Sequence, residues 1–211
     1  MNSLSVELPV GERGKLFLET DKCRNLAVNE VYLDGELKKA EQINENERSY
    51  GIFIHSLILS NSAKVVKVND KDYRVIGDDV EKALSYYTIS KGFDKNLIDS
   101  IAPKISELSV VDDNKLKTTT HIINGKARII SKGPPDELLK KCSYVIIDSK
   151  VVKLTRRLFR DINYAFKYMV NRGMRVYALA IKDFVEISEA INFEASTKNL
   201  TFLALVGIGD S

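Results

Sequence analysis

The sequence predicts an α/β (α+β) fold, in which an antiparallel twisted sheet is flanked by helices. Three observations lead to this prediction. Several short runs alternate in polarity or are rich in β-branched residues, as strands are. Asn124-Gly125 joins two of these runs in the manner of a type I′ hairpin. Longer stretches repeat apolar residues at helical spacing, which favours helices packed on the sheet.

The expected elements follow one another along the whole chain. The predicted strands cover residues 14–21, 29–36, 63–68, 72–76, 105–111, 116–123, 127–132, 174–184 and 199–211. The predicted helices cover residues 46–61, 78–90, 134–142 and 153–173. Asp78 is the expected N-cap of the second helix, and Glu81 completes a capping box. Gly173 is the expected stop of the fourth.

Composition narrows the class of protein. Hydrophobic residues make up 44% and charged residues 29% of the 211 residues, as in soluble globular proteins. The 32 basic and 29 acidic residues are spread along the chain, which argues against nucleic acid as a partner. Cys23 and Cys142 fit no metal spacing, so we expect two reduced thiols. No apolar stretch approaches the ~18 residues of a membrane span.

Six motifs, in order, resemble those of the cytosolic region of P-type cation-transporting ATPases. They are LPVGERGKLFLETDK, LILSNSA, GDDVEKAL, SKGPPDELLKKC, NRGMRVYALA and NLTFLALVGIGD. The family counterparts are the DKTGTLT phosphorylation loop, LLCNDA, GDPTEGAL, KGAPE, GLRVLALA and DLTFLGLVGIxDP. The resemblance covers essentially the whole chain. It implies a nucleotide-binding domain inserted between two hinge strands of a partial phosphorylation domain.

This resemblance implies three parts and a set of site residues. Residues 1–29 would begin the phosphorylation domain, 30–200 would form the nucleotide-binding domain and 201–211 would return to the phosphorylation domain. Asp21 would be the phospho-acceptor, followed by Lys22. The expected nucleotide contacts are Glu81, Lys115 or Lys117, Lys132, Gly133 and Arg175.

These residue types suit a nucleotide. Lysine and arginine counter phosphate charge, arginine through a bidentate fork. A glycine beside Lys132 permits close approach of a ligand to the backbone. The resemblance implies ATP, and Mg²⁺ only with the nucleotide. The implied partners are the rest of the phosphorylation domain, an actuator domain and membrane helices, at the cytoplasmic face of a membrane.

Several positions depart from the family pattern. Arg24 replaces the glycine of DKTGTLT, while Asn25 and Ala27 replace threonines. Val111 stands where the family has an aromatic ring that stacks on adenine, and Val80 replaces the threonine before Glu81. The sequence ends before the family's TGDGVND segment, so we expect no turnover from the isolated chain.

Two hypotheses therefore stay open. In the first, the chain is the ATP-binding domain of a cation-transporting pump, possibly for calcium, and presents nucleotide to Asp21. In the second, it is a degenerate, non-catalytic domain of pump origin that senses nucleotide or docks on a protein.

Overall fold

The computed structural model describes residues 26–68, 73–109, 116–185, 190 and 197–210. The strands are β1 Leu26–Leu33, β2 Glu36–Lys39, β3 Lys64–Lys67, β4 Tyr73–Ile76, β5 Lys104–Ser109, β6 Lys117–Ile123, β7 Lys126–Gly133, β8 Cys142–Ile147, β9 Lys150–Lys153, β10 Arg175–Phe184 and β11 Leu200–Asp210. The helices are η1 Ala40–Gln42, α1 Tyr50–Leu59, α2 Asp79–Ser90, α3 Lys95–Ile101, α4 Pro135–Leu139 and α5 Arg156–Asn171. The predicted strand at 14–21 lies outside the described residues.

One large sheet organises the described part of the chain. Its strands run in the order β2-β1-β11-β10-β7-β6-β5, and each neighbouring pair is antiparallel. β8 pairs with β11 in parallel, and β9 follows β8. β3 and β4 form a separate two-stranded sheet. The predicted class, an antiparallel sheet flanked by helices, is confirmed.

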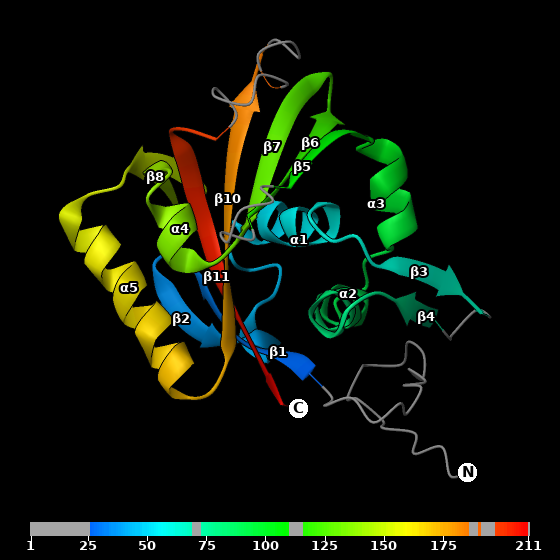
Figure 1. Ribbon diagram of the computed structural model, residues 1–211, viewed down its shortest axis with the longest axis horizontal. Helices are drawn as coiled ribbons and strands as arrows, with labels where there is room; N and C mark the ends of the chain where they lie inside the picture. Colours follow the sequence, from blue (N-terminus) through cyan, green and yellow to red (C-terminus); the bar gives the residue numbers. More distant parts are fainter. Residues whose placement is uncertain (1–25, 69–72, 110–115, 186–189, 191–196, 211) are drawn as a thin grey trace.

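Helices cover both faces of this sheet (Figure 1). On one face, α4 and α5 pack over a core that includes Leu138, Ile162 and Phe202. On the other face, α1, α2 and α3 pack over a core that includes Phe53 and Ile130. The molecule therefore has three layers, with the sheet in the middle.

The first and last described strands lie side by side. β1 pairs antiparallel with β11, from Leu26 opposite Asp210 to Leu33 opposite Ala204. The boundaries expected after residues 29 and 200 fall within these two strands, and both strands continue the large sheet. The division of the chain at these positions stays a prediction.

Local signals in the sequence explain most turns and helix ends. Asp34-Gly35 and Asn124-Gly125 have positive φ angles of 52°, 86°, 51° and 76°, as two-residue hairpins of type I′ require. Gly173 has a φ of +81°, and its N–H donates to the Val170 carbonyl at 2.9 Å, which ends α5.

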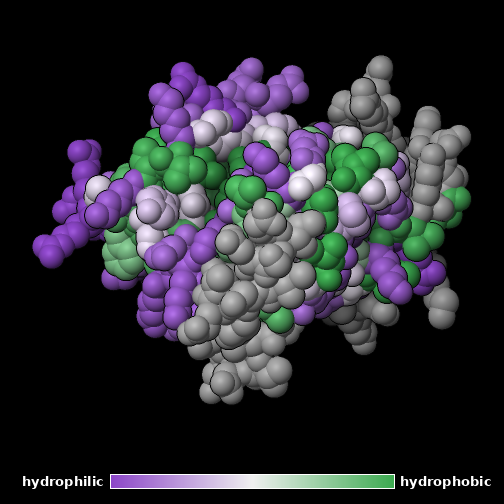
Figure 2. Space-filling view, turned by 90° about the horizontal axis from the view of Figure 1, so that it is seen from above, coloured by the Kyte–Doolittle hydropathy of each residue, from purple (hydrophilic) through white to green (hydrophobic). Residues whose placement is uncertain are grey.

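α5 follows its predicted pattern closely. Ile162, Ala165 and Met169 are buried against the sheet, whereas the opposite side of the helix is exposed. Viewed from above, long hydrophilic side chains project at the left edge of the molecule, where α5 lies (Figure 2). This helix therefore forms an outer wall of the fold.

Candidate functional site

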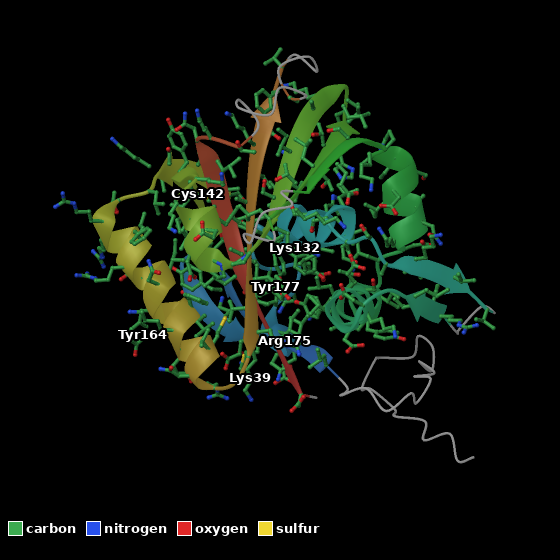
Figure 3. The ribbon with its side chains drawn as sticks, in the orientation of Figure 1. Lys39, Lys132, Cys142, Tyr164, Arg175 and Tyr177 are labelled. Carbon is green, nitrogen blue, oxygen red and sulfur yellow. The ribbon has the colours of Figure 1, made fainter. Side chains whose placement is uncertain are left out.

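Lys132 lies near the end of β7, on the sheet face covered by α1, α2 and α3. Its backbone pairs with Lys117 of β6 on one side and with Leu179 of β10 on the other. The side chain is 7% exposed, a burial that lysine rarely reaches without a partner. Among the described residues, none accepts a hydrogen bond from this ammonium group. In Figure 3 Tyr177 lies between Lys132 and Arg175, and Lys132 pairs with Leu179, two residues beyond Tyr177 on β10.

Burial changes the acid–base chemistry of Lys132. It lowers the pKa of the ammonium group from 10.5 to about 8, with the nearby Lys117 and Lys95 acting in the same direction. The carboxylates of Glu81 and Asp78 raise the pKa and offset part of this effect. A strongly perturbed lysine beside charged partners is a mark of functional sites.

Lys117 lies opposite Lys132 and belongs to a polar network. Its ammonium group donates a hydrogen bond to the Ser62 hydroxyl, and lies 3.7 Å from Glu81 Oε1 and 3.3 Å from Glu107 Oε1. Two like charges opposite each other repel, so these carboxylates make the lysine pair tolerable. Glu107 has a lowered pKa, chiefly through its hydrogen bond to Lys104.

Glu81 connects α2 to this network. Asp78 caps α2 as predicted, because its Oδ1 accepts the Glu81 backbone N–H at 2.8 Å. The predicted capping box is wrong. The Glu81 carboxylate accepts the Ser62 backbone N–H at 3.3 Å and faces Lys117, so it does not turn back to the N-cap. Attraction to a lysine outweighs the local capping bond here.

Arg175 opens β10 and is exposed to solvent. Tyr177 follows two residues later on the same face of the strand and is partly buried. Burial and the carboxylate of Asp78 raise the pKa of Tyr177, whereas Arg175 lowers it. Tyr177 is therefore close enough to both Arg175 and the N-cap of α2 for their charges to act on its hydroxyl group.

Gly133 follows Lys132 and has a packing role of its own. A Cβ built at this position would lie 2.6 Å from Leu116 Cδ2 and 3.2 Å from Leu116 Cα. The close approach of the neighbouring chain alone therefore excludes a side chain. The expected contact of Gly133 with nucleotide stays a prediction.

A Gly133→Ala variant should be destabilised by about 1–3 kcal/mol, because overpacking forces Leu116 and its backbone to move. Chemical denaturation would measure the change. Gly51→Ala is the matched control, since a Cβ at Gly51 in α1 would meet nothing within 4 Å. Alanine in a helix should leave stability unchanged or raise it. An equal loss in both variants would contradict the packing argument.

On the sheet face covered by α1, α2 and α3, the structure thus brings together Glu81, Lys117 and Lys132, with Arg175 farther along β10. Gly133 would direct a Cβ toward Leu116, which belongs to the core on the other face. Asp21, Lys22 and Lys115 lie outside the described residues, as does Val111. In the described part of the chain, no group of three or more His, Cys, Asp or Glu residues could hold a metal ion. Within the same residues, no helix is long and apolar enough to cross a membrane.

Three contributors to the network were not predicted from the sequence: Ser62, Glu107 and Lys95. Lys95 is 8% exposed and donates to the Ile58 carbonyl at 3.2 Å and to Asp99 at 2.9 Å. Of the three, only Ser62 could have been found from the sequence, because it directly follows Asn61 in the LILSNSA motif. The others are brought to the site by tertiary packing.

The remaining reactive side chains have structural surroundings. Cys142 is a free thiol whose pKa burial raises to about 12, and its Sγ lies 3.2 Å from the Leu138 carbonyl. His55 packs edge-on against the Phe93 ring. His121 is buried, and its Nδ1 lies 3.0 Å from the Ala102 carbonyl. Cys23 lies outside the described residues.

The fold and the site define a class of protein. A sequence model of the P-type ATPase cytoplasmic domain N matches residues 49–211, which is most of the chain. The chain belongs to this family, as its motifs predict.

The individual relatives share only about a quarter of their residues with this chain over the aligned region. The chain is 26% identical over 185 residues to calcium-transporting ATPase 1 of Bacillus cereus, covering 88% of this chain and 20% of that protein. It is 26% identical over 176 residues to a calcium-transporting ATPase of Bacillus subtilis, covering 82% of this chain and 19% of that protein. For the cation-transporting ATPase pma1 of Synechocystis the identity is 28% over 154 residues, covering 72% and 16%. The chain spans about a fifth of the length of the two Bacillus relatives.

Proposed function

We propose that this chain is the ATP-binding domain of a cation-transporting pump of the calcium type, at the cytoplasmic face of a membrane. It presents ATP to a phosphoryl-accepting aspartate, for which Asp21 followed by Lys22 is the candidate. The single observation that carries the proposal is the buried side chain of Lys132, whose ammonium group has no hydrogen-bond acceptor among the described residues. The family membership and the names of the calcium-transporting relatives support it.

The donor set fits a nucleotide. Lys132 offers up to three N–H donors from a buried position, and Arg175 offers a guanidinium from an exposed one. The partly buried Tyr177 lies between them and offers an apolar ring to a base. Glu81, held by Ser62 and Lys117, can accept a hydrogen bond from an amino group. Mg²⁺ would arrive with the phosphates, and the rest of the phosphorylation domain, an actuator domain and membrane helices would complete the pump.

Isothermal titration of the chain with ATP, with and without Mg²⁺, tests this proposal. We expect a dissociation constant in the micromolar to millimolar range, or about 4–8 kcal/mol of binding free energy. The lack of an aromatic ring at Val111 places the expected affinity toward the weaker end. No heat up to millimolar ATP would refute the proposal.

An Arg175→Ala variant should bind ATP about two- to tenfold more weakly, because one exposed charged contact contributes about 0.5–1.5 kcal/mol. The same titration measures this change. Arg157→Ala is the matched control, since Arg157 is an exposed arginine of α5 on the opposite face of the sheet. Equal affinities of the two variants would remove Arg175 from the site.

A second candidate function is supported by the altered phosphorylation loop. Arg24 in place of the family's glycine would crowd a phosphate, so a domain that senses nucleotide without catalysis also fits. Autophosphorylation of Asp21, assayed in the longer native protein with Asp21→Asn as control, separates the two candidates. Acid-stable label that persists in the variant, or no label, would favour the sensing module.

A further inference from the structure

The outer side of α5, which faces away from the sheet, carries a concentrated positive charge. Residues 153–172, which include α5, hold six basic residues and one acidic residue, a net charge of +5. The whole chain has a net charge of only +3, so the remaining residues have a small negative excess. The basic residues are therefore less evenly spread than the overall counts suggest.

The exposed residues of α5 form a stripe at helical spacing. Arg157, Arg160, Tyr164 and Lys167 follow one another at intervals of three, four and three residues, which places them on one side of the helix. This side is opposite the apolar residues that pack on the sheet. Tyr164 is 74% exposed, and Figure 3 shows it on the outer side of α5. The Tyr168 ring, one turn further along, is 40% exposed.

The charges of this stripe have only weak partners within the molecule. The Nε atoms of Arg157 and Arg160 lie 3.8 and 3.9 Å from the same carboxylate, that of Asp161, which is too far for a hydrogen bond. The two arginine side chains are 85% and 77% exposed. Arg156 and Lys167 are exposed and have no hydrogen-bond or ion-pair partner among the described residues. The N–H donors of this side of α5 are therefore available to a ligand.

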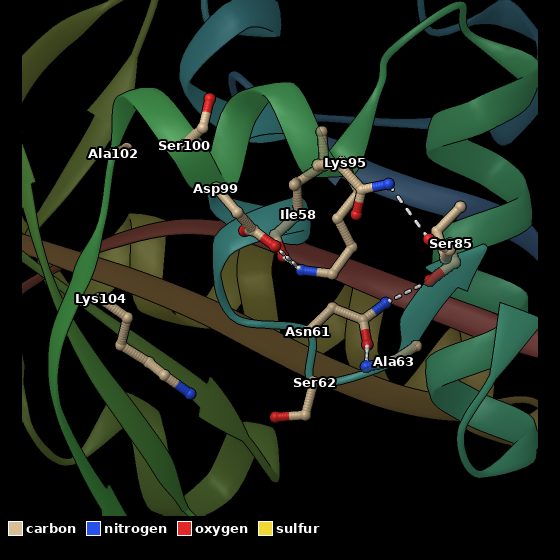
Figure 4. Close-up of polar contacts among 12 residues, drawn as sticks. Ile58, Asn61, Ser62, Ala63, Ser85, Lys95, Asp99, Ser100, Ala102 and Lys104 are labelled. Atoms are coloured by element: carbon tan, nitrogen blue, oxygen red, sulfur yellow. Dashed lines mark hydrogen bonds and ion pairs between the residues drawn. The ribbon is translucent and has the colours of Figure 1, made fainter. Parts of the chain in front are cut away.

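Basic residues elsewhere in the fold show the contrast. Lys95 donates a hydrogen bond to Asp99 at 2.9 Å (Figure 4). Arg128 donates two hydrogen bonds to the carboxylate of Asp183, at 2.6 and 2.7 Å. The second pair shows the bidentate geometry that an arginine adopts with a carboxylate. On α5 the arginines are present in the same form, but the matching carboxylates are not.

The composition of the stripe favours a protein as the partner. Arginine and tyrosine are enriched at protein interfaces, whereas lysine is depleted there. A helix that binds a membrane surface buries its apolar side in lipid, but the apolar side of α5 is covered by its own sheet. Nucleic acid is disfavoured by the small net charge of the whole chain. Charge complementarity then requires that the partner be acidic.

We propose that the outer side of α5 docks an acidic segment of another protein. Carboxylates of this segment pair with Arg157, Arg160 and Lys167, and an apolar side chain of the segment packs on the Tyr164 ring. α5 and Lys132 lie on opposite faces of the sheet, so docking does not depend on bound nucleotide.

Fluorescence anisotropy of a labelled peptide tests the proposal. The probe has about twelve residues, in which pairs of glutamates alternate with leucine, and in extended form it exceeds the ~15 Å from Arg157 to Lys167. We expect a dissociation constant of about 100 μM or below at moderate salt. The same peptide with glutamine in place of glutamate should bind at least tenfold more weakly.

Variants of the stripe locate the peptide. The triple variant Arg157→Gln, Arg160→Gln and Lys167→Gln should bind it about tenfold more weakly, while circular dichroism shows an unchanged fold. The matched control removes three exposed lysines from other parts of the surface and should change affinity less than twofold. Its substitutions are Lys64→Gln, Lys104→Gln and Lys126→Gln.

Tyr164→Ala separates docking from attraction by net charge alone. It leaves every charge in place and should weaken peptide binding about threefold, because the exposed ring is lost as a packing surface. Full affinity in this variant, or equal losses in the two triple variants, would overturn the proposal.

The remaining arms test other occupants of this side of α5. Saturating ATP should leave peptide affinity unchanged, and displacement of the peptide by ATP would place it at the nucleotide site instead. Tighter binding to short duplex DNA, or to phosphatidylcholine vesicles with about 30% phosphatidylserine, would assign the stripe to nucleic acid or to a membrane. A dimer in size-exclusion chromatography that the α5 triple variant dissociates would assign it to a second copy of the chain. Each of these results would overturn the proposal.

Discussion

Replacing Phe202 with alanine is expected to lower the free energy of unfolding by about 3–5 kcal/mol, the usual range for a phenylalanine removed from a core. Phe202 lies in β11 and is completely buried. Its ring packs at 6.4 Å from the Tyr32 ring, between the sheet and the helices α4 and α5. Total stability of a domain is about 5–15 kcal/mol, so this loss is a large share of it.

The position of Phe202 explains why the effect should spread. β11 pairs with β1, β10 and β8, so it joins three parts of the sheet. Phe202 itself pairs with Ala180 of β10 and with Val145 of β8. A cavity here would loosen the strand that joins β1, β10 and β8. Urea denaturation followed by circular dichroism measures the change.

Phe159→Ala provides the matched control, since Phe159 in α5 is 44% exposed. We expect it to change stability by less than about 1 kcal/mol. Similar losses in the two variants would mean that β11 does not hold the core together in this way.

The sequence predicted most of the fold because its signals are local. The two Asp-Gly and Asn-Gly turns need positive φ at both positions, which few residue pairs tolerate. The long helix α5 repeats its apolar residues over four turns. By contrast, α3 is not among the predicted helices. It has only seven residues, and its main local signal is the N-cap Asp94. Every residue of β9 is exposed, so no alternation marks it as a strand.

Part of the candidate site could also have been predicted from the Asn124-Gly125 turn. Ile123 pairs with Lys126 across Asn124-Gly125, and counting six residues outward along both strands brings Lys117 opposite Lys132. The hairpin register therefore predicts the lysine pair. The position of Glu81 could not be predicted in this way, because it depends on how α2 packs against the sheet. Local rules assigned Glu81 to a capping box, and the tertiary partner Lys117 redirected it.

A Lys132→Met variant is expected to lose ATP affinity and to gain stability at pH 7. Methionine keeps much of the apolar stem but removes the charge. Loss of a charged hydrogen bond should weaken ATP binding by about 1.5–3 kcal/mol, or roughly 10- to 100-fold. At the same time, an ammonium group no longer has to be buried without a described acceptor, which should stabilise the fold by about 1–3 kcal/mol. Titration calorimetry and denaturation measure the two effects.

The stability gain should depend on pH in a defined direction. The pKa of Lys132 is about 8 in the folded chain, against an ordinary value of 10.5. Between these values the unfolded chain binds more protons, so the stability of the unaltered protein rises with pH relative to the variant. The advantage of Lys132→Met should therefore be about 2 kcal/mol smaller at pH 9.5 than at pH 7.

Lys126→Met is the control for both measurements, because Lys126 is exposed at the turn between β6 and β7. It should bind ATP normally, and its stability relative to the unaltered protein should not vary between pH 7 and 9.5. If Lys132→Met kept full affinity, the buried ammonium group would have no part in nucleotide binding. If it lost affinity but its advantage did not change with pH, Lys132 would contact ATP while its pKa in the free protein stayed near the ordinary value of 10.5. Only both results together support a lysine whose burial costs stability and is retained for the ligand.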